Sequence, residues 1–74
     1  MTHEEIIKAW FAIDEWSGDV CTKLFSYKYP ERKIYVAEIR FDFETFVSQD
    51  TDRYKAMERA VNEYSEWVVR HESR

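Results

Sequence analysis

The chain has 74 residues and a formal net charge of −4 at neutral pH, and 18% of its residues are aromatic. This length corresponds to one small domain, whose thin core we expect to be rich in aromatic side chains. A single cysteine, Cys21, excludes an intramolecular disulfide and is typical of a reducing compartment. Because no apolar run is long enough to cross a bilayer, the sequence predicts a cytoplasmic protein without membrane contact.

The first predicted element is a helix. Thr2 and Glu5 have the spacing of a capping box, which predicts a helix over about residues 3–16. Apolar side chains surround most of this helix, which is more than a small sheet can cover. Surplus apolar surface indicates an interface, and Trp is a frequent anchor of protein contacts. We therefore predict a protein interface made of Ile7, Trp10, Phe11 and Trp16.

The middle of the chain predicts a hairpin. Residues 20–43 contain two runs rich in β-branched and aromatic residues, as antiparallel strands require. Pairing Phe25 with Ile39 places nearly all apolar side chains on one face, which a half-buried sheet favours. On this register Tyr27 and its neighbouring tyrosines point toward the helices, away from the positive charges of the turn. The basic turn consists of Lys28, Arg32 and Lys33.

The closing element is a second helix. Apolar residues spaced by three and four predict an amphipathic helix over about residues 51–72. The whole chain, residues 1–74, is then one domain of the α+β fold class, an α-β-β-α order in which two helices pack on an antiparallel hairpin. Such a hairpin has unpaired edges and is marginal alone, which favours completion by dimerisation. A third strand within residues 45–48 remains an open alternative.

Acidic residues are frequent in and after the second predicted strand. A row of carboxylates at strand spacing would imitate nucleic-acid phosphates and block a DNA- or RNA-binding protein. The other interpretation is a solvated strand face with acids near a helix N-terminus, where the helix dipole favours them. The residues concerned are Glu38, Asp42, Glu44, Asp50 and Asp52.

Residue types that commonly act in catalysis or metal binding are few in this sequence. His3 and His71 lie near opposite ends of the chain, and Cys21 has no neighbour at metal-ligand spacing. The single glycine excludes a glycine-rich phosphate loop. We therefore expect no enzymatic activity, no metal site and no cofactor.

The leading hypothesis is a small protein-binding module of regulator or inhibitor type that forms a homodimer. In general style, though in no motif, the chain resembles the accessory and host-modulating proteins of bacteria and their phages. The first alternative is a nucleic-acid mimic that acts through Glu38, Asp42 and Glu44. The second is weak nucleic-acid binding by the hairpin at residues 27–35, although the negative net charge argues against nucleic acid as a partner.

Overall fold

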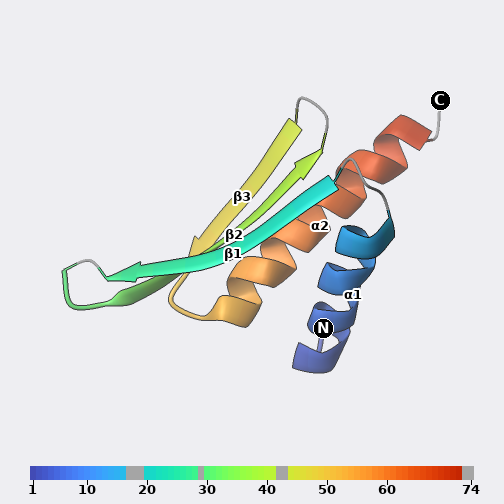
Figure 1. The fold of residues 1–74 in the computed structure, drawn as a ribbon. Helices are drawn as coiled ribbons and strands as arrows, with labels where there is room; N and C mark the ends of the chain where they lie inside the picture. The colour runs from blue at the N-terminus through green and yellow to red at the C-terminus, as the bar shows by residue number, and fades with distance from the viewer. Residues whose placement is uncertain (17–19, 29, 42–43, 73–74) are drawn as a thin grey trace.

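The computed structural model of the protein describes residues 1–16, 20–28, 30–41 and 44–72, and for residues 14–16 and 72 it describes the backbone alone. The elements are α1 (His3–Trp16), β1 (Val20–Lys28), β2 (Lys33–Phe41), β3 (Glu44–Asp50) and α2 (Arg53–Glu72). The three strands form an antiparallel sheet with β2 in the middle, and both helices lie on one side of it (Figure 1). The predicted α+β fold class is confirmed.

The N-terminus of α1 is held by the predicted capping box. The backbone N–H of Thr2 donates to Glu5 Oε1 at 3.1 Å, and the backbone N–H of Glu5 donates to Thr2 Oγ1 at 3.2 Å. The hydrogen bond from the Thr2 backbone, supported by its hydroxyl, lowers the pKa of Glu5 below the ordinary value of 4.5. Two N–H groups without helical partners are thereby satisfied, and α1 begins at the residue that the sequence indicates.

The core lies between α2 and the helix side of the sheet. Ala37, Ala56 and Ala60 are fully buried, and their small side chains let α2 approach β2 closely. From α1, Ile6 and Trp10 join the same cluster. The other buried members are Val20, Ile39, Met57, Val61 and Tyr64.

Aromatic rings fasten the second half of α2 to β2 and β3. Phe41 meets Trp67 edge to face, with ring centroids 5.4 Å apart, and Phe46 meets Tyr64 in the same way at 5.9 Å. Each such pair contributes about 0.5 to 1.5 kcal/mol beyond the burial of its surface. Of these four rings only Tyr64 is buried, so the aromatic rings border a core that is mostly aliphatic, and the prediction of an aromatic core holds only in part.

The sheet has a third strand in addition to the predicted hairpin. Residues Glu44–Asp50 form β3, which pairs with β2 from Glu44 opposite Phe41 to Asp50 opposite Tyr35. The open alternative of a strand within residues 45–48 is therefore correct. Because β3 covers one edge of β2, the two-stranded hairpin is stabilised within a single chain.

The predicted register of the hairpin is wrong by three residues. Phe25 lies opposite Val36 instead of Ile39, and Lys28 lies opposite Lys33 at the end of the hairpin. Because side chains alternate along a strand, an odd shift moves those of β1 to the other face relative to β2. The physical reason is that β1 is an edge strand. Only its beginning, with Val20 buried and Thr22 half-buried, is covered by the helices.

The far end of the β1–β2 hairpin extends beyond the helices (Figure 1). Leu24 belongs to the helix side by its place in the register, yet 41% of its surface is exposed. Ser26 and Lys28, further along the same side, are exposed as well. The second half of β1 is therefore held by its pairing with β2 more than by the core.

A cross-strand disulfide tests the observed register. We expect Arg40→Cys to form a disulfide with Cys21, because directly opposite residues have Cβ atoms about 4.5 to 5.5 Å apart. Mass spectrometry after mild oxidation reads out the bond. Glu38→Cys, which lies opposite Lys23 on the same face, is the matched control and should cross-link far less. Equal cross-linking of both variants would contradict the register.

Candidate functional site

The candidate site is the face of the sheet that points away from the helices. The register assigns to this open face every second residue of each strand. Its members are Cys21, Lys23, Phe25 and Tyr27 from β1, Ile34, Val36, Glu38 and Arg40 from β2, and Thr45, Val47 and Gln49 from β3. Neither described helix covers it (Figure 1).

One half of the open face is apolar. Phe25 is 49% exposed, Tyr27 41% and Val47 46%, all high values for such side chains. Val36 is only 3% exposed, although it lies outside the main core cluster. Its neighbours across the sheet, Phe25 and Gln49, account for this burial. We call Phe25, Tyr27, Ile34, Val36 and Val47 the apolar patch.

A hydrogen bond fixes one edge of the apolar patch. The hydroxyl of Tyr27 donates to Gln49 Oε1 at 3.2 Å, so the side chain of Tyr27 reaches from β1 across β2 to β3. Arg32 from the turn lies beside these two residues around a shallow hollow. This hydrogen bond restrains the orientation of the Tyr27 ring.

The other half of the open face carries charges of both signs. Lys23 lies opposite Glu38, and Arg40 Nη2 contacts Glu38 Oε1 at 3.5 Å. The side chain of Arg40 is 64% exposed and that of Glu38 is 19% exposed. An exposed pair of this kind contributes little stability, about 0 to 1 kcal/mol, so both groups can exchange partners readily.

The predicted interface on α1 is only partly exposed. Trp10 is 6% exposed and belongs to the core, so its predicted role as a surface anchor does not fit its position. Phe11 is 56% exposed and Ile7 is half-buried. The side chain of Trp16 lies outside the described residues. On α1 the large apolar side chain that does face water is therefore Phe11.

The predicted row of carboxylates is divided between different parts of the fold. Glu38 lies on β2 on the open face, whereas Glu44 begins β3 on the helix side, and Asp42 lies outside the described residues. The expectation that these acids alternate along one strand is wrong, because β2 ends at Phe41 and the chain reverses before β3. This arrangement removes the regular spacing on which phosphate mimicry depended.

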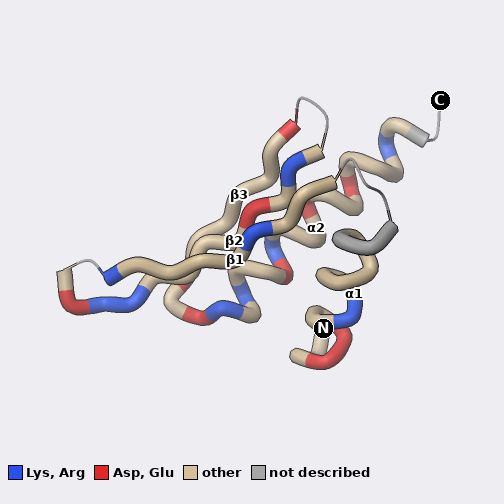
Figure 2. The backbone as a smooth tube through the Cα atoms, in the orientation of Figure 1, with Lys and Arg blue, Asp and Glu red and all other residues tan. Residues whose placement is uncertain are grey.

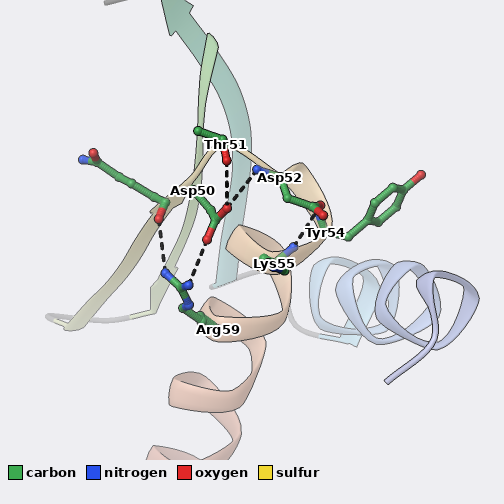
Figure 3. Close-up of polar contacts among 7 residues, drawn as sticks. Asp50, Thr51, Asp52, Tyr54, Lys55 and Arg59 are labelled. Atoms are coloured by element: carbon green, nitrogen blue, oxygen red, sulfur yellow. Dashed lines mark hydrogen bonds and ion pairs between the residues drawn. The ribbon is translucent and has the colours of Figure 1, made fainter. Parts of the chain in front are cut away.

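Asp50 and Asp52 stabilise the start of α2 (Figure 3). Asp52 Oδ1 accepts the backbone N–H of Tyr54 at 2.8 Å and that of Lys55 at 3.4 Å, as an N-cap does. Asp50 Oδ2 forms an ion pair with Arg59 Nη2 at 2.8 Å. Arg59 also donates to the backbone carbonyl of Gln49, so it joins the end of β3 to α2.

The pKa of Asp50 is lowered below its ordinary value of 3.8. The main cause is the hydrogen bond from the backbone N–H of Asp52 to Asp50 Oδ1, at 2.9 Å. Partial loss of water opposes this effect, while the positive charge of Arg59 acts in the same direction as the hydrogen bond. The ionised carboxylate of Asp50 therefore stabilises the loop before α2 by holding the Asp52 backbone and Arg59.

The basic turn lies at the end of the projecting hairpin (Figure 2). Lys28 and Lys33 are exposed and directly opposite each other on the helix side of the sheet, whereas Arg32 lies near the hollow of the open face. The expectation that Tyr27 points toward the helices, away from the positive charges of the turn, is wrong, because Tyr27 lies on the open face beside Arg32. Tyr35 does lie on the helix side as expected, and Tyr29 is outside the described residues.

The histidines take part in packing. The ring of His3 stacks on Tyr54 with centroids 3.8 Å apart, and that of His71 stacks on Trp67 at 4.0 Å. Among the described residues, no group of three or more His, Cys, Asp or Glu side chains is placed to hold a metal ion. No described helix is long and apolar enough to cross a membrane.

Sequence reasoning missed the apolar patch. The predicted register turns Phe25 and Tyr27 inward, and Val47 belongs to a strand only in the open alternative for residues 45–48. The alternation of Phe46, which packs inward, with the exposed Val47 was the available signal for β3.

Comparison with protein-family models, with curated proteins and with solved structures finds no match.

The N-cap of α2 is open to a direct test. We expect Asp52→Ala to lower the free energy of unfolding by about 1 kcal/mol, because two N–H groups of the first turn lose their acceptor. Urea unfolding followed by circular dichroism measures the change. Thr51→Ala is the matched control with a smaller expected loss, since Thr51 only donates to Asp50 at 3.4 Å. An equal loss in both variants would contradict the assignment of the cap.

The lowered pKa of Asp50 predicts a specific effect of pH. Because the pKa in the folded state lies below the ordinary value of 3.8, ionised Asp50 stabilises the fold above that pH, and this contribution is lost as pH falls through the folded-state pKa. We expect Asp50→Asn to be less stable at neutral pH and to lose less stability than the wild type between about pH 5 and pH 2.

Urea unfolding at a series of pH values measures this difference. Glu63→Gln, which removes an exposed carboxylate from α2, is the control and should keep the slope of the wild type. Parallel curves for Asp50→Asn and the wild type would show that the carboxylate has the same pKa in both states.

Proposed function

We propose that the protein is a small protein-binding module that associates with a second copy of itself through the open face of its sheet. The observation that supports this most is the exposure of Phe25 and Tyr27, at 49% and 41%, on a face that no described helix covers. Covering apolar surface contributes about 25 cal/mol per Å² removed from water. A role as a regulator or inhibitor fits a module that acts by occupying a partner without chemistry of its own.

The charges of the open face favour a second copy as the occupant. Its charged half carries the cations Lys23 and Arg40 beside the anion Glu38. In a two-fold symmetric dimer the same patch meets itself, so Glu38 of one copy can lie against a cation of the other. A partner with charge of a single sign would satisfy only part of this arrangement.

The size of the face predicts the strength of the association. Strands of this length extend about 30 Å, and three of them are about 14 Å wide, so the contact lies at the small end of specific interfaces. Interfaces of this class are transient. We therefore expect a reversible dimer with a dissociation constant on the order of micromolar.

Sedimentation equilibrium over a wide concentration range tests the proposal. We expect the wild type to dimerise and Phe25→Ser to weaken the association at least about tenfold, because a central aromatic anchor is lost from both copies. Leu24→Ser is the matched control. This residue is on the same strand with a similar exposure, 41%, but on the helix side, so its removal should leave the association unchanged.

Two results would overturn the proposal. One is a wild-type chain that stays monomeric at every concentration. The other is a dimer that is lost in Phe11→Ser but kept in Phe25→Ser, which would assign the interface to α1. Circular dichroism of each variant tests whether the fold is intact. We expect it to be, because Phe11, Leu24 and Phe25 are exposed.

A further inference from the structure

Three cations lie on the helix side of the sheet, two at the far end of the hairpin and one at the start of α2. Lys28 and Lys33 are direct partners in the register, and Arg53 is the first residue of α2. The Lys33 Nζ atom and the Arg53 Cζ atom both lie 5.5 Å from the centroid of the Tyr35 ring. We call Lys28, Lys33 and Arg53 the basic cluster, and all three are exposed. In Figure 2 the far end of the hairpin and the start of α2 both carry Lys and Arg segments.

The positive charge of the basic cluster is not neutralised within the described residues. None of the three cations forms an ion pair there. The adjoining acids are already engaged, since Asp50 pairs with Arg59 and Asp52 caps α2. In the turn, Glu31 forms no ion pair with any of the three cations in the described part of the chain.

This arrangement is unfavourable for the isolated fold. Like charges directly opposite each other on neighbouring strands destabilise a sheet, and the Lys28–Lys33 pair is of this kind. Arg53 lies with Lys33 at the ring of Tyr35, so it adds a positive charge beside this pair. An anion bound between the three cations would relieve the repulsion, which is the property of a phosphate-binding surface.

We propose that the basic cluster binds the phosphate backbone of nucleic acid. Among the described residues at this point, neither tyrosine ring is free to stack on a base. Tyr35 is covered by Lys33 and Arg53, and Tyr54 is stacked on His3. Contact is therefore made through phosphates, without preference for sequence, and is strongly dependent on salt. This surface lies on the opposite side of the sheet from the apolar patch, so it does not depend on the dimer.

Fluorescence anisotropy with a labelled 20-base-pair duplex and with its labelled single strand tests the proposal. Three phosphate contacts predict that the logarithm of the association constant falls with the logarithm of salt concentration with a slope of about −2.7 for the duplex. Lys33→Gln and Arg53→Gln should each reduce the slope by about 0.9 and weaken binding roughly tenfold at low salt. Lys23→Gln, the same change of charge on the open face, should leave both values unchanged.

A charge reversal separates binding from folding. Lys33→Glu places opposite charges in the cross-strand pair, so we expect a melting temperature equal to or above that of the wild type together with loss of duplex binding. Phe25→Ser should bind the duplex as the wild type does, even where it no longer dimerises. Failure of the dimer and failure of nucleic-acid binding are thereby distinguished.

Four results would overturn the proposal. The first is absence of duplex binding at low salt. The second is an equal loss of affinity in Lys23→Gln, which would indicate general electrostatic attraction. The third is binding of the single strand alone, which would indicate stacking of bases. The fourth is competition by inorganic phosphate at a concentration equal to that of the duplex phosphates, which would assign a site for a single ion.

Discussion

The position of β2 between β1 and β3 is the constraint on which the rest of the structure depends. A central strand has hydrogen-bonding partners on both edges, and its side chains alternate between two environments. Ala37 and Ile39 point to α2 and are fully buried, whereas Val36 is buried on the other face by side chains of the neighbouring strands. With β2 fixed in this way, β1 and β3 become edges whose outward side chains remain available to partners.

The single hairpin gives the two sides of the sheet different chemistry. Alternation along β1 sends Phe25 and Tyr27 to the open face, and it sends Lys28 to the helix side with its partner Lys33. The apolar patch and the basic cluster are thus built from interleaved positions of the same strands. A protein with a net charge of −4 can in this way carry a local positive surface. Its nearby carboxylates lie elsewhere: Asp52 caps α2, and Asp50 forms an ion pair with Arg59.

The helices could be predicted from the sequence because their signals are local. The capping box of Thr2 and Glu5 and the regular spacing from Tyr54 to Val68 each lie within one element. The register could not be predicted, since maximising apolar residues on one face assumes that all of β1 is covered, and α1 and α2 cover only its beginning. The same error turned Phe25 and Tyr27 inward, whereas both are exposed on the open face. Trp10, predicted at the surface from the apolar circumference of α1, is a core residue.

The hairpin that projects beyond the helices also has a consequence for local stability. From Leu24 onward the side chains of β1 are exposed, so we expect its hydrogen bonds with β2 to open without unfolding of the core. Amide protons there should then exchange with solvent faster than those beside Ile39. A ligand that holds the two strands together at this end would slow that exchange locally. Its binding affinity would be lowered by the free energy required to order the hairpin.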